Sequence, residues 1–143
     1  MFVVMLSISF AGHFCMLNEF SDKEHEMHEL SLMEGVLDTV RSSASENGII
    51  RVNYVKLVIG KLSMALPDSL QFAFQALKQQ DKLFEDAVLE IEEKEIIGRC
   101  GECREEFEID NHYWFICPQC KGRNVEIIGG RELFIDYFEG DEN

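Results

Sequence analysis

Positive charge is scarce in this chain of 143 residues. Thirteen Lys and Arg residues stand against 27 Asp and Glu residues, which gives a formal net charge of −14 at pH 7. Such a surface repels the phosphate backbone of nucleic acids and the headgroups of anionic lipids. The composition therefore predicts that the chain binds neither nucleic acid nor a membrane.

Proline, histidine and long apolar runs are also scarce. Two prolines and 46% hydrophobic residues argue for a folded chain. The apolar run at residues 2–17 is too short to span a bilayer and lacks the basic start of a secretory signal. Only His112 lies beyond residue 28 among the four histidines, and no Ser-His-Asp or Cys-His pairing can be inferred. We therefore expect a cytoplasmic protein that is not an enzyme.

Hydrophobic periodicity predicts two helices and four strands. One helix begins near Leu30, with Ser31 and Glu34 as a capping box, and ends at Asn47-Gly48, and a second helix begins at Pro67. The predicted strands are 51–59, a strand starting at Ala87, 125–128 and 133–138. This order predicts an α+β fold, a small mixed β-sheet with two helices plus an inserted zinc-ribbon-like module with four cysteines.

The same pattern predicts the domain boundaries. Residues 27–97 and 125–143 form the α+β domain, and residues 98–124 form the metal module. Residues 1–26 are expected to be an N-terminal extension outside the fold, because the polar stretch 18–26 is typical of a flexible lead-in.

Four of the five cysteines form two C-x-x-C pairs. Cys100 and Cys103 are followed, after thirteen residues, by Cys117 and Cys120, whereas Cys15 stands alone. Two tight pairs in a chain without a secretory signal indicate a metal site rather than disulfides. Four thiolates close a tetrahedral site, which suits a structural Zn²⁺. Zinc binding, worth on the order of 10 kcal/mol, can supply the folding energy that such a small module lacks.

Two alternatives exist for the cysteine module. A rubredoxin-like iron site also uses two C-x-x-C turns, but such sites usually carry Gly after each pair, where this chain has Arg104 and Lys121. A nucleic-acid-binding zinc ribbon needs basic surface, yet residues 99–123 hold four Lys or Arg against five Asp or Glu. Both are weaker interpretations than structural zinc.

A second candidate metal site lies at residues 24–29, which read EHEMHE. His25 and His28 stand here among three carboxylates, a donor set that suits Ni²⁺, Zn²⁺ or Cu²⁺. The alternative is a solvated acidic surface, which is the commoner meaning of such a stretch.

The chain resembles the hydrogenase nickel-incorporation protein family, HypA/HybF, from Met27 to about Glu139. The resemblance rests on several motifs in the family's order: MHELSL at 27–32, EGVL at 34–37, IGKLS at 59–63, PDSLQFAF at 67–74, both C-x-x-C pairs, and GREL at 130–133.

The resemblance implies a nickel metallochaperone for [NiFe] hydrogenase. Members of the family work with a HypB-type GTPase and carry nickel to the hydrogenase large subunit. Their nickel ligands are the free amine of the first Met, backbone amide nitrogens and the imidazole of the next residue. Carried over, the nickel site falls at Met27, His28 and Glu29, with Ni²⁺ as transferable cargo and Zn²⁺ as the structural metal.

The chain departs from the family in carrying 26 residues before Met27, which turn its amine into a peptide nitrogen. Either translation begins at Met27, or His25 joins His28 in a rebuilt site. The first interpretation is favoured, because residues 1–26 match neither the predicted elements nor a clean targeting signal. The alternative function is a zinc-ribbon adaptor without transferable metal. The oligomeric state stays open, with a homodimer as one option.

Overall fold

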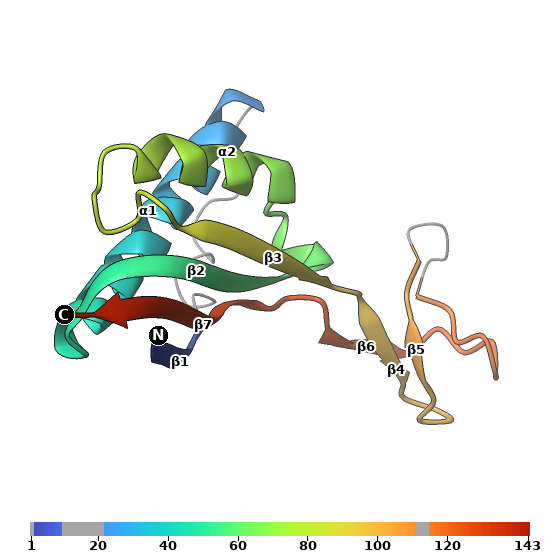
Figure 1. The fold of residues 1–143 in the computed structure, drawn as a ribbon. Helices are drawn as coiled ribbons and strands as arrows, with labels where there is room; N and C mark the ends of the chain where they lie inside the picture. The colour runs from blue at the N-terminus through green and yellow to red at the C-terminus, as the bar shows by residue number, and fades with distance from the viewer. Residues whose placement is uncertain (1, 10–21, 111–114) are drawn as a thin grey trace.

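Two sheets of different size organise the chain. The computed structural model describes residues 2–9, 22–110 and 115–143, and it describes the backbone alone at residues 2, 6–9 and 22–28. Both helices lie on one face of a four-stranded sheet, and a three-stranded sheet projects from one end of it (Figure 1). The predicted α+β class is confirmed. Within the described residues, no helix is long and apolar enough to cross a membrane.

The four-stranded sheet has the order β1-β7-β2-β3. Its strands are β1 (Phe2–Ser9), β2 (Ile49–Gly60), β3 (Val88–Lys94) and β7 (Leu133–Glu142). Strand β2 pairs in parallel with β3 and antiparallel with β7. The predicted strand at 51–59 is therefore confirmed, and it occupies a central position.

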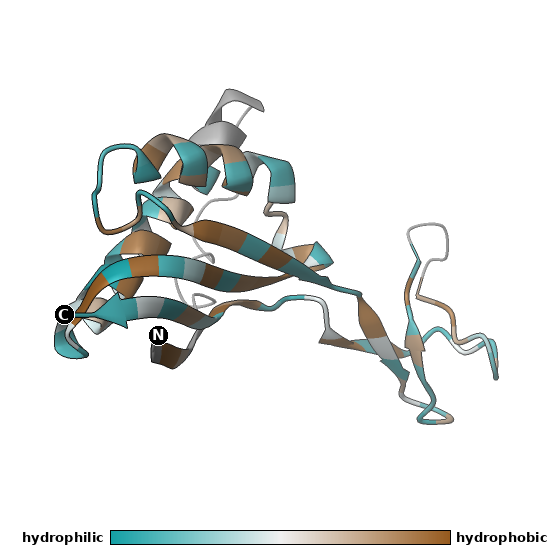
Figure 2. Cartoon of the chain, in the orientation of Figure 1, coloured by the Kyte–Doolittle hydropathy of each residue, from teal (hydrophilic) through white to brown (hydrophobic). Residues whose placement is uncertain are grey.

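Two helices cover the core face of this sheet. Helix α1 spans Asp22–Glu46, and the short 3₁₀ helix η1 (Lys61–Ser63) leads to α2 (Pro67–Lys78). Helix α1 contacts β2 and β7, and α2 contacts α1 and β3. Both apolar stripes are buried in the core, and they include Met33, Val36, Leu37, Val40 and Ala44 in α1 and Leu70, Ala73 and Phe74 in α2. Figure 2 shows hydrophobic and hydrophilic residues alternating along β2 and β3, as expected for a sheet with one buried face.

Helix α1 begins earlier than predicted. Its first residue is Asp22, so Ser31 and Glu34 lie inside the helix and do not cap it, and the expected lead-in is helical from residue 22. The cause is composition, since Glu, Lys and Met favour helices and acidic side chains complement the positive end of the helix dipole. The predicted end is confirmed, because Gly48 with φ +70° follows the last turn.

The prediction that residues 1–26 lie outside the fold is wrong at both ends of that segment. Phe2–Ser9 forms β1, which pairs antiparallel with β7, and Val4 packs against the main core. The sequence FVVMLSIS consists mostly of residues that favour a half-buried strand. The extension therefore adds an edge strand to the sheet.

The three-stranded sheet has the order β5-β4-β6, with β4 at Ile97–Cys100, β5 at Glu106–Glu108 and β6 at Val125–Gly129. Strand β6 pairs antiparallel with β4. The boundary predicted at residue 125 is therefore wrong, since β6 belongs to the cysteine module. The pairing of β6 with β4 closes the module at its base, next to the point where both strands join the larger sheet.

Close backbone packing joins the two sheets. The amide of Gly60 donates to Glu132 O at 2.6 Å, and the amide of Leu62 donates to Gly130 O at 2.7 Å. An ion pair between Lys61 and Glu95 at 2.7 Å spans the same junction. The end of β2 therefore lies directly on the segment through which the chain returns from the module.

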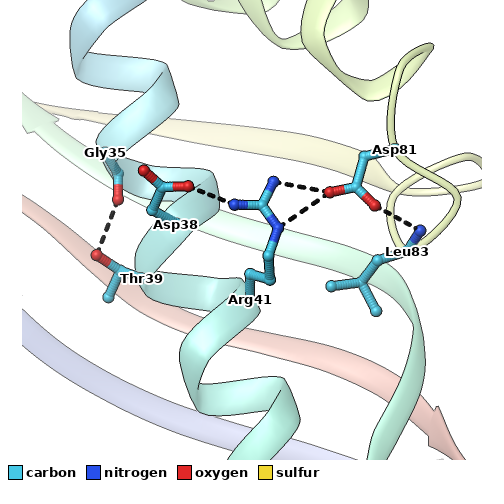
Figure 3. Close-up of polar contacts among 6 residues, drawn as sticks. All are labelled: Gly35, Asp38, Thr39, Arg41, Asp81 and Leu83. Atoms are coloured by element: carbon cyan, nitrogen blue, oxygen red, sulfur yellow. Dashed lines mark hydrogen bonds and ion pairs between the residues drawn. The ribbon is translucent and has the colours of Figure 1, made fainter.

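A salt-bridge network ties α1 to the loop between α2 and β3 (Figure 3). Arg41 donates from Nε and Nη2 to Asp81 Oδ2 at 3.1 and 2.7 Å, and from Nη1 to Asp38. Hydrogen bonding to Asp81 raises the pKa of Arg41. Burial opposes ionisation of Asp81, but hydrogen bonds from Arg41 and from the amide of Leu83 lower the pKa of its carboxyl below 3.8.

We predict that Arg41→Ala lowers the free energy of unfolding by about 1 kcal/mol at neutral pH, as expected for a partly exposed ion pair in which two N–H groups donate to one carboxylate oxygen. Because the pKa of Asp81 in the folded protein lies below the ordinary 3.8 of an Asp carboxyl, the loss should be full above pH 3.8 and should shrink as the pH falls from 3.8 through the lowered pKa. Urea titrations at several pH values measure this. Arg51→Ala is the control, since the Arg51–Asp86 pair is longer, at 3.6 Å, and more exposed. Equal losses in the two variants would contradict the assignment.

We also predict that Gly60→Ala costs about 3 kcal/mol of unfolding free energy, because overpacking against fixed backbone cannot be relieved by a rotamer change. A Cβ at this position would lie 2.1 Å from Gly130 O. Gly48→Ala is the matched control, since a Cβ at this position would have no atom within 4 Å. Its loss of unfolding free energy should be only about 1 kcal/mol, the cost of placing Ala at φ +70°. Denaturant unfolding of both variants tests the junction, and a smaller loss at Gly60 than at Gly48 would refute it.

Candidate metal centres

The four predicted cysteines lie together at the tip of the module. Their sulfur atoms all lie within 4.8 Å of one another. The closest pairs join the two turns, with Cys100 Sγ 3.5 Å from Cys120 Sγ and Cys103 Sγ 3.4 Å from Cys117 Sγ. A tetrahedral zinc site with Zn–S bonds of 2.3 Å needs sulfurs about 3.8 Å apart. The spacing of the cluster therefore fits a four-coordinate metal with little rearrangement.

Both C-x-x-C pairs adopt the same turn. In the first, the amide of Arg104 donates to Cys100 O at 3.0 Å, and in the second, the amide of Lys121 donates to Cys117 O at 2.9 Å. Arg104 and Lys121 both have φ +62°, a left-handed conformation that favours Gly. The backbone thus takes the Gly-type turn at both positions even though the sequence has long basic side chains there.

Backbone amides also point at the sulfurs. The amide of Glu102 lies 3.4 Å from Cys100 Sγ, and the amide of Gly122 lies 3.4 Å from Cys120 Sγ. Amides from Cys103 and Glu102 lower the pKa of Cys100 to about 7. The amide of Gly122 favours the Cys120 thiolate, yet the neighbouring Cys100 thiol, burial and the other two sulfurs together raise the pKa of Cys120 to about 12. The cluster therefore holds protons that a metal ion must displace.

The module has almost no apolar core. Among its described residues, 97–110 and 115–129, only Gly98, Cys100 and Cys117 are buried. Cys103 and Cys120 are exposed. A segment that buries so little apolar surface needs another source of folding energy, which metal ligation by the cysteines can supply.

The second predicted site, Met27, His28 and Glu29, lies in α1. The side chains of Met27, His28 and His25 are outside the described part of the structure, as is His112. Glu29 is 3% exposed, and its Oε1 accepts a hydrogen bond from the amide of Leu66 at 3.4 Å. Leu66 is the residue that precedes α2, so the Glu29 carboxylate ties the motif to the start of the second helix.

Sequence reasoning missed this role of Glu29. A carboxylate in an acidic stretch resembles solvated surface, and no local pattern places it against a backbone amide 37 residues further along. It also missed the left-handed turns, although the identities of Arg104 and Lys121 had already drawn attention to these positions. Both features depend on backbone geometry that residue types do not encode.

Comparisons with known proteins identify the family. The family model described as "Hydrogenase/urease nickel incorporation, metallochaperone, hypA" matches residues 27–140. A hydrogenase maturation factor HypA from Moorella thermoacetica is 46% identical over 115 residues, which cover 80% of this chain and 100% of that protein. Its counterpart from Desulfitobacterium hafniense is 40% identical over 116 residues, 81% of this chain and 100% of that protein.

Two solved structures share the fold. The solution structure of the Ni metallochaperone HypA from Helicobacter pylori has a TM-score of 0.57 at 22% identity, covering 80% of this chain and 98% of that one. A second HypA solution structure has a TM-score of 0.62 at 23% identity, covering 82% and 98%. Since the family match spans most of the sequence and includes both candidate sites, the chain belongs to the HypA family of nickel-incorporation metallochaperones.

Proposed function

We propose that this chain takes up Ni²⁺ at Met27, His28 and Glu29 and delivers it to the large subunit of [NiFe] hydrogenase, with a HypB-type GTPase as partner. In this proposal Zn²⁺ is held by Cys100, Cys103, Cys117 and Cys120 and serves structure alone. The observation that carries the proposal is that the family match begins at Met27, the first residue of the nickel motif.

The burial of Glu29 supports different roles for the side chains of Glu29 and His28 within the motif. Its carboxylate is engaged by the amide of Leu66, so the contribution of Glu29 to nickel is its backbone nitrogen. His28 supplies an imidazole, which suits Ni²⁺. The carboxylate then fixes the position of the two residues before it relative to α2.

The helical backbone of α1 opposes nickel binding through amide nitrogens. In a helix that begins at Asp22, the amides of residues 27–29 are committed to carbonyls one turn earlier. A chain whose first residue is Met27 lacks that preceding turn, so the same nitrogens and the amine are available. The 143-residue chain has to unwind the first turns of α1 to offer them.

Four cysteine ligands fit zinc by number, donor type and spacing. Zinc bound here adds a closed coordination shell with no place for water, and the backbone amides of both turns favour the thiolate forms that it needs. Among the described residues, the main core consists of members of 33–89 and 133–138 and includes none from the module. Zinc loss should therefore loosen the module and spare the larger sheet.

We predict that Cys→Ala at any of the four positions lowers the zinc content below one per chain, because three thiolates leave the site open to water. Elemental analysis after dialysis against a weak chelator measures it, with Cys15→Ala as the matched control. Hydrogen exchange should rise across β4–β6 and stay unchanged in β2.

Zinc should also be lost on acidification, since protons compete for the thiolates. Full zinc retention in any of the four variants would contradict the assignment.

We predict that a chain beginning at Met27 binds Ni²⁺ in a yellow, diamagnetic square-planar form, since amine and amide nitrogens impose a strong ligand field. The 143-residue chain should bind more weakly, in a six-coordinate paramagnetic form. Absorption spectra and titration calorimetry on zinc-loaded protein measure both properties.

Two histidine variants separate the alternatives. His28→Ala should weaken nickel binding in both chains, whereas His25→Ala should matter in the 143-residue chain alone. Equal affinity and identical square-planar spectra in the two chains would show that the amine is not a ligand. No nickel uptake by the shorter chain would favour the adaptor function.

A further inference from the structure

The outer edge of β7 takes no part in the proposed nickel and zinc sites. Strand β1 covers it, with Val3 opposite Glu139, Val4 opposite Phe138 and Met5 opposite Tyr137. The family match begins at Met27 and so does not include β1. In the part of the fold that the family shares, the strand order is β7-β2-β3, and β7 is an edge strand.

An uncovered β7 presents unpaired backbone groups along a strand of ten residues. Such an edge is a template for pairing with another extended segment, and proteins use it for strand addition. Strand β1 demonstrates that this edge accepts an antiparallel strand, with the apolar side chain of Val4 packed against the core. Its register is interrupted by an irregularity between Met5 and Ile8, so the pairing is imperfect.

Charge indicates what kind of strand fits this edge. Strand β7 carries Asp136, Glu139, Asp141 and Glu142 and no basic residue, and β1 carries no ionisable side chain. Burial raises the pKa of Tyr137, and the nearby carboxylates of Glu139, Glu90 and Asp136 raise it further. Among these carboxylates, Glu139 lies opposite Val3 and is the diagonal neighbour of Met5. Basic side chains at these two β1 positions would therefore gain ion pairs that β1 does not make.

The side chains of Val3 and Met5 lie on the exposed face of β1. Val3 is 49% exposed and Met5 is 74% exposed, whereas Val4 packs inward. An incoming strand could therefore keep an apolar residue at the Val4 position and carry Lys or Arg at the Val3 and Met5 positions. A second copy of β7 does not fit, because antiparallel pairing would bring the acidic side chains of both strands together.

We propose that the outer edge of β7 is a docking site for an extended partner segment that alternates apolar and basic residues, and that β1 occupies this site in cis. Because β1 is tethered, its high effective concentration makes it a competitor of any partner strand. In the 143-residue chain, β1 thus covers a sheet edge that is open in the part of the fold matched by the family.

A fluorescent peptide tests the proposal. The probe is residues 2–9 with Val3→Lys and Met5→Lys, and the neutral residues 2–9 peptide is its control. The 143-residue chain with Val4→Asp, which puts a charge into the core contact of β1, should bind the basic probe at least tenfold more tightly than the unaltered chain does. Val3→Thr, on the exposed face, should leave binding unchanged.

A chain beginning at Met27 provides an independent arm if Val4→Asp fails to fold, because relatives of this length match along their entire sequence. It should bind the basic probe about threefold more tightly than the neutral one at low salt, and Glu139→Gln or about 0.5 M NaCl should abolish that preference. Circular dichroism and zinc content establish that the chain is folded. If the folded shorter chain takes up neither peptide, or dimerises at this edge instead, the proposal is wrong.

Discussion

The convergence of four cysteine sulfurs is the interaction on which the smaller sheet depends. Cys100 and Cys117 are two of the three buried residues among those described in the module. Without a ligand shared by all four thiols, the strands β4, β5 and β6 have little besides their backbone ladder to hold them. A metal ion held by all four thiolates would join the two C-x-x-C turns and supply the folding energy that the small buried surface of the module does not.

The two candidate metal sites lie in different parts of the fold. The cysteine cluster lies in a module that projects from one end of the main sheet, whereas Met27–Glu29 lies on α1 beside the start of α2 (Figure 1). In the proposed function, zinc takes the thiolates, and nickel takes nitrogen donors from the start of α1, whose backbone has to unwind to offer them. Different donor sets in different domains allow one protein to retain one metal and transfer the other.

Hydrophobic periodicity and cysteine spacing predicted those features of the structure that depend on local sequence. The stripe at Leu70, Ala73 and Phe74 identified α2, and the spacing of the C-x-x-C pairs identified the cluster, since both are local patterns. The predicted start of α1 was wrong, because it depends on helix propensity beyond the apolar stripe. The assignment of residues 125–128 to the larger domain was also wrong, because it depends on the long-range pairing of β6 with β4. The place of β1 was missed for the same reason, since nothing local in Phe2–Ser9 specifies β7 as its partner. The nickel ligands remain a prediction.

X-ray absorption at the nickel and zinc edges tests the division of labour most directly. The sample is a zinc-loaded chain beginning at Met27 with one equivalent of Ni²⁺. We expect nitrogen and oxygen scatterers alone around nickel, and four sulfur scatterers at about 2.3 Å around zinc. Sulfur in the nickel shell, with a matching loss of sulfur around zinc, would place the cargo in the cysteine cluster and contradict the proposed separation of the two metals.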